Sequence, residues 1–442
     1  MLTKLLKRYL YILAKLALWR FRPKIIAITG NVGKTSAKEA ILAVLSAKFK
    51  VRGPEKNFNN EFGVPLTILG WSNYRKNIFG WLWTSLTYPF LLMGFWGYPR
   101  ILILEMGADR PGDIDYLTKL ARPNIGVVTA VGKIPVHVEF FDSPEALAAE
   151  KAVLVEHTNP KGFVILNADD RQVLAMRSMA RARVLLYGTS QNADIRVENI
   201  EAHLNPHTFP RGILEGVGIN LEPENAILGW LTFKISDKGA VVPIHLNDAI
   251  NPVQSMAAAA AYAVGKALGM NSVEISSALN AYRPPAGRTK IIKGINGSII
   301  LDDTYNAAPA AVEAALATLK IIPARRRIAI LGNMAELGEY TAEAHRDIGK
   351  LVAEVADILI AVGDKAALIR DEASLEGLDI HWVEMSREVA ALILPIIREG
   401  DVILVKGAQS MRMERVVEDL MAEPQKAKDL LVRQSMDWKQ MD

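Results

Sequence analysis

The apolar residues of this chain fall into short continuous runs separated by longer stretches of mixed polarity. The apolar runs in "PKIIAITG", "ILILEMG" and "FVILNADD" have the length of strands, and their lack of alternation indicates burial on both faces. The stretch "KTSAKEAILAVL" after the first run instead places Ile41, Leu42, Val44 and Leu45 on one side of a helix. Strands that alternate with helices predict an α/β fold with a mostly parallel sheet.

The same alternation resumes in the C-terminal part of the chain, after the proline-rich run "RPPAGR". We interpret that run as a linker and expect a second, Rossmann-like α/β domain after it. No G-x-G-x-x-G follows the first strand of this part, so we do not expect a nicotinamide site. The predicted divisions are residues 1–22, 23–282 and 283–442, with an apolar insertion at about 73–99.

Residues 1–22 predict a basic amphipathic helix. Lys4, Lys7, Arg8 and Lys15 recur at helical spacing, with leucine and tyrosine on the other face and no acidic residue in the segment. Helices of this kind lie in the surface of anionic membranes, so we expect peripheral membrane contact on the cytoplasmic side. One alternative is a helix packed on its own domain. A cleaved signal peptide is the other, and Lys15 argues against it because it interrupts the apolar run.

A second apolar segment, residues 78–97, has the sequence "IFGWLWTSLTYPFLLMGFWG" and carries no charge. It is long enough to span a bilayer, but one crossing would put the strands before and after it on opposite sides of the membrane. Pro89 favours a kinked or re-entrant hairpin that contacts the membrane. The alternative is an ordinary buried or lid-like insertion.

Composition excludes several classes of chemistry. The 442 residues, half of them hydrophobic, are enough for two or three domains with cores. A net charge of +4 is too small to indicate a nucleic-acid-binding protein. The chain has no cysteine, which excludes disulfides, thiol catalysis and thiolate metal sites and fits a reducing, cytoplasmic compartment.

The sequence "AITGNVGKTS", residues 27–36, connects the first strand of the domain to its first helix. Backbone amides at such a glycine turn face phosphate groups. Lys34 adds a positive charge, and the hydroxyl of Thr35 is suited to bind magnesium. This phosphate-binding loop (P-loop) therefore predicts a site for ATP and Mg²⁺. Its expected nucleotide-binding residues are Gly30, Asn31, Gly33, Lys34, Thr35 and Ser36.

The loop has the form T-G-x-x-G-K-T, with Ile28 where the usual first glycine stands. In this form it resembles the loop of the Mur ligase family, which joins amino acids to carboxylates using ATP. Four further segments follow in the family's order: "KNFNNEFGVP", "DDTYNAAP", "NMAELGE" and "VKGAQSMRME". Of these, "DDTYNAAP" and "NMAELGE" resemble its D-alanyl-D-alanine-adding branch. The resemblance covers residues 23 to about 425. It implies that the family's N-terminal uridine-nucleotide-binding domain is lacking.

The resemblance also implies roles for residues outside the loop. Glu105 ends a strand where the family has a metal-binding glutamate, and His137 corresponds to a histidine of the second metal site. Lys151 falls where the family has a lysine that reacts with carbon dioxide to give a carbamate, an anionic metal ligand. Asn251 corresponds to an asparagine that helps to hold adenine.

Two further residues belong to the C-terminal domain. Arg288 would reach the phosphates, and Asp303 the ribose, when the domains close. The resemblance thus implies Lys34, His137, Lys151 and Arg288 as the catalytic residues.

The implied reaction is the ATP-dependent ligation of a muramoyl-peptide acceptor to a D-alanyl-D-alanine-type amine in the synthesis of peptidoglycan precursors. Phosphorylation of the carboxylate would make it reactive towards the amine. One alternative is a lipid-linked acceptor or another carboxylate, such as a folate or a polyamino acid. A nucleotide-binding membrane adaptor that has lost catalysis is another.

Overall fold

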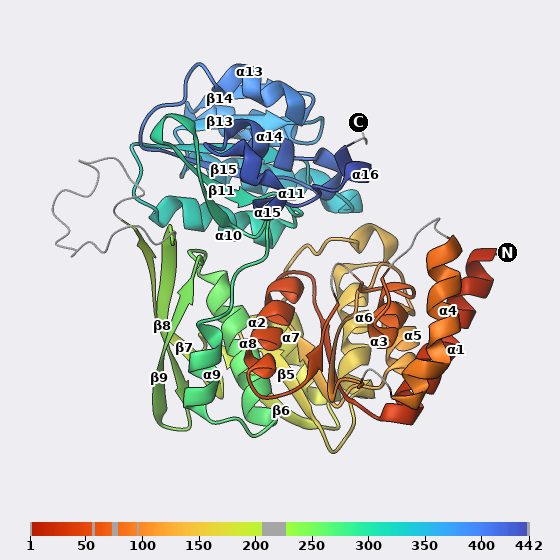
Figure 1. The fold of residues 1–442 in the computed structure, drawn as a ribbon. Coiled ribbons are helices and arrows are strands. Elements are labelled where there is room, and N and C mark those ends of the chain that lie inside the picture. The colour runs from red at the N-terminus through yellow and green to blue at the C-terminus, as the bar shows by residue number, and fades with distance from the viewer. Residues whose placement is uncertain (1, 55–57, 73–77, 95–96, 206–226, 440–442) are drawn as a thin grey trace.

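The structure is a computed structural model that describes residues 2–54, 58–72, 78–94, 97–205 and 227–439, and it contains two α/β domains (Figure 1). Parts of two predicted features lie outside the described residues. These parts are residues 56–57 of "KNFNNEFGVP" and residues 73–77 and 95–96 of the apolar insertion.

The larger domain is built on a nine-stranded sheet with the order β2-β3-β1-β4-β5-β6-β7-β8-β9. Neighbouring strands are parallel from β2 to β7, and β7, β8 and β9 form an antiparallel ribbon. The strands are β1 (Lys24–Thr29), β2 (Val51–Arg52), β3 (Ile101–Glu105), β4 (Ile125–Val128), β5 (Phe163–Asn167), β6 (Arg183–Gly188), β7 (Ile195–Leu204), β8 (Gly229–Asp237) and β9 (Ala240–Asn247). The three segments in which apolar runs predicted strands contain β1, β3 and β5.

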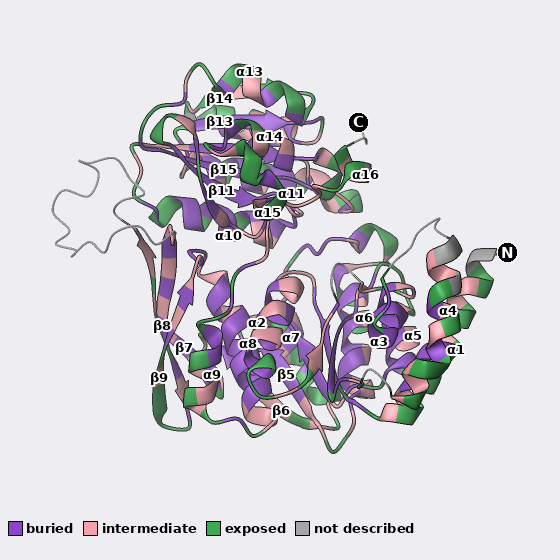
Figure 2. Ribbon diagram, in the orientation of Figure 1, coloured by how far each residue is buried: buried purple, intermediate pink, exposed green. Residues whose placement is uncertain are grey.

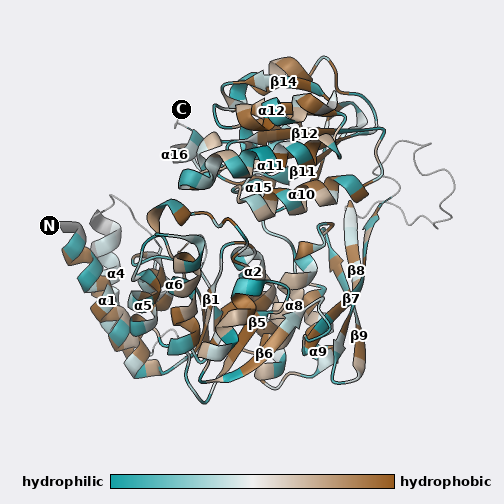
Figure 3. Ribbon diagram, turned by 180° about the vertical axis from the view of Figure 1, so that it is seen from behind, coloured by the Kyte–Doolittle hydropathy of each residue, from teal (hydrophilic) through white to brown (hydrophobic). Residues whose placement is uncertain are grey.

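Helices cover both faces of this sheet. Ile26 and Ile28 of β1 pack with helices on one face, whereas Ile25 and Ala27 pack with helices on the other. Burial on both faces explains why the parallel strands lack polar positions, and β5 and β6 are accordingly brown in Figure 3. The first face carries α2 (Lys34–Ser46), α8 (Val253–Ala267) and α9 (Ser272–Leu279); the second carries α1 (Leu2–Phe21), α3 (Gly63–Leu69), α5 (Asp113–Leu120), α6 (Pro144–His157) and α7 (Arg171–Ala175).

The smaller domain has a six-stranded sheet with the order β10-β11-β15-β12-β13-β14. Its strands are parallel except for β10, which pairs antiparallel with β11. The strands are β10 (Lys290–Lys293), β11 (Ile299–Asp303), β12 (Arg326–Gly332), β13 (Ile358–Val362), β14 (Asp379–Val383) and β15 (Asp401–Lys406). The helices are α10 (Pro309–Ile321), α11 (Thr341–Ala353), α12 (Ala367–Ala373), α13 (Val389–Ile393), α14 (Glu414–Leu420), α15 (Ala427–Leu430) and α16 (Met436–Lys439). These two sheets confirm the predicted fold class.

Residues 78–93 form one helix, α4 (Ile78–Met93), so the hairpin expected there is wrong. Pro89 lies inside α4 and removes a helical hydrogen bond, but packing against α1 supports the helix near the proline. The hydroxyl of Tyr88 donates to the carbonyl of Leu13 at 2.7 Å. Figure 1 shows α1 and α4 side by side at the outer edge of the larger domain. Among the described residues, none of the helices combines the length and apolarity needed to cross a membrane.

The predicted domain divisions can be placed on this fold. Helix α1 buries Leu10, Leu13, Ala14 and Ala17 in the same core as β1 and β3, so α1 packs as part of the larger domain. The predicted boundary at residues 282 and 283 falls between the end of α9 and the start of β10. We propose that the chain divides into its two main domains there.

Candidate functional site

The phosphate-binding loop turns sharply between β1 and α2. Gly30 has φ +140° and Gly33 has φ +86°, which are conformations that favour glycine. A Cβ atom on Gly30 would lie 2.1 Å from Oγ1 of Thr129, so the loop and β4 approach too closely for any side chain there. The hydroxyl of Thr129 in turn donates to the carbonyl of Val32 at 2.7 Å and fixes the loop.

Helix α2 begins directly at this turn. Its N-cap, Gly33, provides no side-chain hydrogen bond to the first turn of the helix. The amides of that turn, together with the helix dipole, therefore suit an anion. Lys34 bends back over the loop, and its Nζ donates to the carbonyl oxygens of Gly30 at 2.9 Å and Asn31 at 3.2 Å. Burial lowers the pKa of Lys34, an effect that the nearby Glu105 partly opposes.

Glu105 ends β3 next to this loop, as its position at the end of an apolar run predicted. Parallel pairing places β3 beside β1, so the carboxyl ends of both strands meet at one edge of the sheet. Oγ1 of Thr35 lies 3.5 Å from Oε2 of Glu105. Two oxygen atoms at this spacing can be ligands of one Mg²⁺.

One pocket of about 340 Å³ brings residues of both domains together. From the predicted set, it is lined by Asn31, Gly33, Lys34, Thr35, Glu105, His137 and Arg288. Gly30 and Ser36 do not line it. Gly30 lies in the turn against Thr129, and Ser36 is buried within α2.

His137 follows β4 and has φ +72°. Its Nε2 lies 3.6 Å from Oδ1 of Asp109, and its Nδ1 lies 2.5 Å from Oε2 of Glu336 in the C-terminal domain. The hydrogen bond with His137 lowers the pKa of Glu336. His137 thus contacts carboxylates from both domains at the edge of the pocket.

Arg288 enters the pocket from the linker between the domains. Its guanidinium carbon lies 4.0 Å from the centre of the Tyr305 ring, which holds the side chain in place. Nε of Arg288 and Nδ2 of Asn31 are buried and have no hydrogen-bond partner among the described residues. Buried donors need acceptors, so the oxygen-rich triphosphate of a nucleotide fits this pocket.

Lys151 lies on α6 and is 1% exposed. Burial, and next the positive charge of Lys34, lower its pKa to about 7. A substantial fraction of its amine is therefore uncharged at neutral pH. Among the described residues, no three histidine, aspartate or glutamate side chains are grouped closely enough to hold a metal ion by themselves.

A second pocket of about 210 Å³ shares Val32 and Gly33 of the loop with the first. Its walls are largely apolar and include Tyr187, Met256 and Ala257, with Asn167 at its polar edge. An apolar slot with few polar groups, next to a phosphate site, has the character of a nucleoside pocket.

Two predicted ligands lie elsewhere. Nδ2 of Asn251 donates to Oγ1 of Thr289 at 3.0 Å, and Asn251 lines neither pocket. Asp303 is 5% exposed, and its Oδ2 accepts from Nζ of Lys406 at 2.7 Å. Thr289 also donates its backbone N–H to Asp303. Asn251 and Asp303 therefore both contact the start of the C-terminal domain, and their nucleotide contacts remain predictions.

The structure also adds pocket residues that sequence reasoning did not assign to the site. Asp109, four residues beyond the end of β3, could have been found as a second strand-end carboxylate. Tyr305 and Gln409 come from different parts of the C-terminal domain, and no local pattern links them to the loop.

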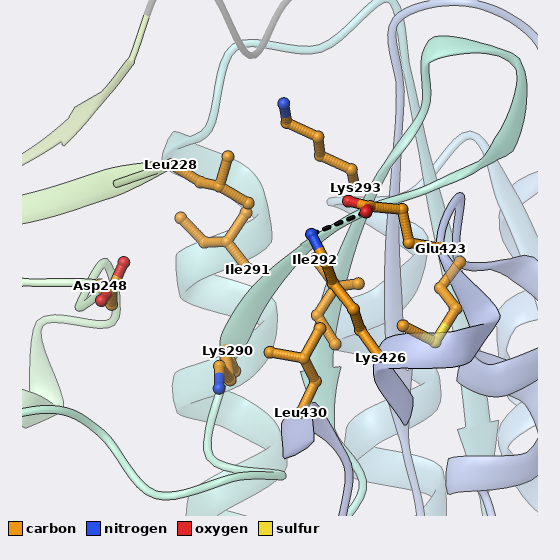
Figure 4. Close-up of a pocket in the computed structure, with 10 residues that line it drawn as sticks. Leu228, Asp248, Lys290, Ile291, Ile292, Lys293, Glu423, Lys426 and Leu430 are labelled. Carbon is orange, nitrogen blue, oxygen red and sulfur yellow. Dashed lines mark ion pairs between the residues drawn. The ribbon is translucent and has the colours of Figure 1, made fainter. Parts of the chain in front are cut away.

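A further pocket of about 310 Å³ lies between the β8–β9 side of the larger domain and β10 (Figure 4). Leu228 and Ile291 contribute apolar walls, and Nζ of Lys426 pairs with Glu423 at 2.6 Å. None of the predicted nucleotide or metal ligands lines this pocket, so it is separate from the nucleotide site.

Comparison with known proteins identifies the same two domains. The Mur ligase middle domain model matches residues 85–227, and the Mur ligase glutamate ligase domain model matches residues 287–409. The second match begins at the proposed interdomain linker and contains Arg288 and Asp303.

Individual relatives agree over most of the chain. UDP-N-acetylmuramoyl-tripeptide–D-alanyl-D-alanine ligase of Mycobacterium leprae is 30% identical over 427 residues, 90% of this chain and 74% of that protein. The protein of the same name from Bacillus subtilis is 25% identical and covers 93% of this chain and 79% of its own length. The crystal structure of the MurF ligase from Thermotoga maritima in complex with ADP has a TM-score of 0.74 at 25% identity, covering 95% of this chain and 84% of that chain. The chain belongs to the Mur ligase family.

Proposed function

We propose that this protein is an ATP-dependent ligase that forms an amide bond between the carboxylate of a muramoyl-peptide-type acceptor and a D-alanyl-D-alanine-type amine. The observation that carries the proposal is the pocket in which Lys34, Glu105, His137 and Arg288 meet between the two domains. The names of the relatives supply the substrates, because the Mycobacterium leprae and Bacillus subtilis relatives are both named as D-alanyl-D-alanine ligases.

ATP would bind across the phosphate-binding loop. Its triphosphate would accept hydrogen bonds from the loop amides, Asn31 and Lys34, while the nucleoside would occupy the apolar slot beside Met256. The Thermotoga maritima relative is in complex with ADP, which supports nucleotide binding by this chain. Arg288 would reach the phosphates from the linker.

Mg²⁺ fits the residues present. Thr35 and Glu105 would supply two oxygen ligands for one ion, and phosphate oxygens the others. A second ion would be held by His137 and by Lys151 as its carbamate. The uncharged amine of Lys151 is the form that attacks carbon dioxide, releasing one proton as the carbamate forms, and its low pKa favours this form. Mg²⁺ held by these residues would supply positive charge against the carboxylate and the triphosphate.

The chain's own residues would activate the carboxylate by position and charge. Lys34 and Arg288 would stabilise the negative charge on the γ-phosphoryl oxygens as that group moves to the acceptor carboxylate. The product is an acyl phosphate and ADP. The amine then attacks the acyl carbon, the carbon–oxygen bond breaks, and inorganic phosphate leaves. Asn306 and Gln409 line the C-terminal side of the pocket, where the second substrate would enter.

The acceptor could carry its muramoyl peptide on a uridine nucleotide or on a lipid. We expect turnover with the uridine-linked form, because the relatives' names specify it. The contact of residues 1–22 and 78–97 with a membrane remains a prediction. A lipid-linked acceptor would give that contact a role in catalysis.

Phosphate release tests the proposed reaction. The protein is incubated with ATP, Mg²⁺, D-alanyl-D-alanine and a muramoyl tripeptide in uridine-linked or lipid-linked form, and the ligated product is identified by its mass. We expect phosphate only when acceptor and amine are both present. If the protein binds ADP tightly but releases no phosphate with either acceptor, the proposal is contradicted and the nucleotide-binding adaptor is favoured.

A further inference from the structure

Helix α1 exposes a continuous apolar stripe. The exposed side chains are Leu5, Tyr9, Ile12, Leu16 and Trp19, with exposed fractions from 39% to 70%. They follow one another at intervals of four and three residues, which places them on one side of the helix. The opposite side of α1 packs into the core of the larger domain. The stripe therefore faces away from the protein.

Helix α4 carries a second stripe of the same kind. Trp83, Leu86, Phe90 and Met93 are 68%, 70%, 51% and 66% exposed and are spaced by three and four residues. Thr84 and Tyr88, on the inner side of the helix, are buried. The outer side of α4 thus presents large apolar groups to solvent, although the chain buries such groups elsewhere.

The two stripes adjoin. The hydroxyl of Tyr9, in the first stripe, donates to Oγ of Ser85 at 2.9 Å. Ser85 precedes Leu86 of the second stripe in the sequence. Figures 1 and 2 show α1 and α4 side by side, with exposed residues along the outer side of both helices. We call the nine residues of the two stripes the two-helix face. Apolar surface that is contiguous over two helices marks an interaction site.

The charges that α1 and α4 themselves contribute to its edge are all positive. Lys4, Arg8 and Lys15 are exposed, and each precedes a stripe residue by one position, so they lie along the same edge of the α1 stripe. Exposed Arg20 follows Trp19 on the other side. Helices α1 and α4 contain no acidic residue. An occupant must therefore combine an apolar layer with negative charge at its rim.

We infer that the two-helix face binds the surface of an anionic lipid bilayer. The nine apolar side chains would enter the boundary between headgroups and acyl chains, and the basic edge would contact phosphate headgroups. Tryptophan and tyrosine, which prefer this boundary, supply three of the nine. A second copy of the chain fits less well, because a symmetric contact would enclose the cations of both copies without an acidic residue from either helix.

This inference does not depend on the proposed reaction, because it concerns a surface whose residues line neither nucleotide-site pocket. Co-sedimentation of the full chain with vesicles tests it directly. The vesicles are phosphatidylcholine alone or phosphatidylcholine mixed with phosphatidylglycerol, at low and high salt. We expect binding to the anionic vesicles, weakened by salt because exposed charges are screened.

Two variants locate the contact. The first variant removes three apolar groups from the two-helix face by combining Trp19→Ser, Trp83→Ser and Leu86→Ser. Each lost group should weaken binding to the vesicles by at least about tenfold. The second variant removes three cations by combining Lys4→Gln, Arg8→Gln and Lys15→Gln. Each lost cation should weaken binding to anionic vesicles by about fivefold. Thermal unfolding and ADP binding confirm that each variant is folded.

The matched control is Val273→Ser with Leu375→Ser, two apolar residues that are each 77% exposed elsewhere on the surface. This variant should bind vesicles as the wild type does. The inference is overturned if the wild type does not bind anionic vesicles, or if the three-serine variant binds them equally well. Light scattering that shows a dimer lost only in the three-serine variant would identify a second copy as the occupant and would also overturn it.

Discussion

His137 and Glu336 connect the two domains at the edge of the nucleotide pocket. Nδ1 of His137 lies 2.5 Å from Oε2 of Glu336, and both residues have positive φ, 72° and 62°. Left-handed backbone is unfavourable for residues with a side chain, so the surrounding structure holds both side chains in this contact. A more exposed pair, Lys133 and Glu343, joins the domains nearby at 2.9 Å.

Removing this contact should loosen the domains and leave the nucleotide loop intact. For Glu336→Ala we expect nearly unchanged ADP affinity, because Glu336 does not line the loop pocket. The change in stability should be about 1 kcal/mol or less, since both side chains are partly exposed. The radius of gyration from small-angle X-ray scattering should increase. Glu339→Ala is the control and should leave this radius unchanged. An unchanged radius would show that other contacts hold the domains.

Gly30 and Gly112 form a matched pair for testing the loop. Both have positive φ, but a Cβ at Gly30 would meet Thr129 at 2.1 Å, whereas one at Gly112 would meet nothing within 4 Å. Gly112→Ala should therefore lower the free energy of unfolding by only about 1 kcal/mol, through backbone strain. Gly30→Ala adds the steric clash with Thr129, so it should lower the free energy of unfolding by at least about 2 kcal/mol. It should also weaken ADP binding. Urea unfolding and calorimetry measure both effects, and equal losses would argue against the described turn.

Lys34→Ala should abolish most turnover. Loss of a buried positive charge at the phosphoryl group should lower the rate of phosphate release by about 10²–10³-fold. Lys161→Ala removes an exposed lysine from the same domain and should leave the rate unchanged. Vesicle binding by Lys34→Ala should equal that of the wild type, because the two-helix face is untouched. Unaltered turnover would refute the role proposed for Lys34.

Burial of Lys151 should make stability depend on pH. Its pKa is about 7 in the folded protein and 10.5 for an ordinary lysine. Between these values the unfolded chain binds the extra proton, so the wild-type free energy of unfolding should rise with pH from about 7 to 10, by at most about 1.4 kcal/mol per unit. In carbon-dioxide-free buffer, Lys151→Met should lack this component, whereas Lys161→Met should retain it. Parallel pH profiles for the wild type and Lys151→Met would show that Lys151 has an ordinary pKa.

Much of the fold could be predicted because burial on both faces of a parallel sheet leaves a simple pattern. The run "ILILEMG" predicted the strand that contains β3, and the T-G-x-x-G-K-T loop predicted the turn before α2. The place of Glu105 at the end of a strand could be predicted in the same way, whereas its metal-binding role came from the family resemblance. Such local features depend on a few neighbouring residues.

The remainder depends on contacts between distant segments. A hairpin was expected at Pro89 from local geometry, but packing of α4 on α1 outweighs the lost hydrogen bond. The contact of Arg288 with Tyr305 arises from the course of the linker. Asn251 matched a family position, yet its amide contacts Thr289, which no sequence pattern indicates.

The central claim, that ATP held at the loop converts a carboxylate into an acyl phosphate, can be tested by following one oxygen atom. The acceptor muramoyl peptide is labelled with oxygen-18 in its terminal carboxylate and incubated with the protein, ATP, Mg²⁺ and D-alanyl-D-alanine. Mass spectrometry then measures the label in the released phosphate. We predict that each phosphate formed from doubly labelled carboxylate carries one oxygen-18, because the carboxylate oxygen that accepts the phosphoryl group leaves with it. Ligated product accompanied by unlabelled phosphate would contradict the claim.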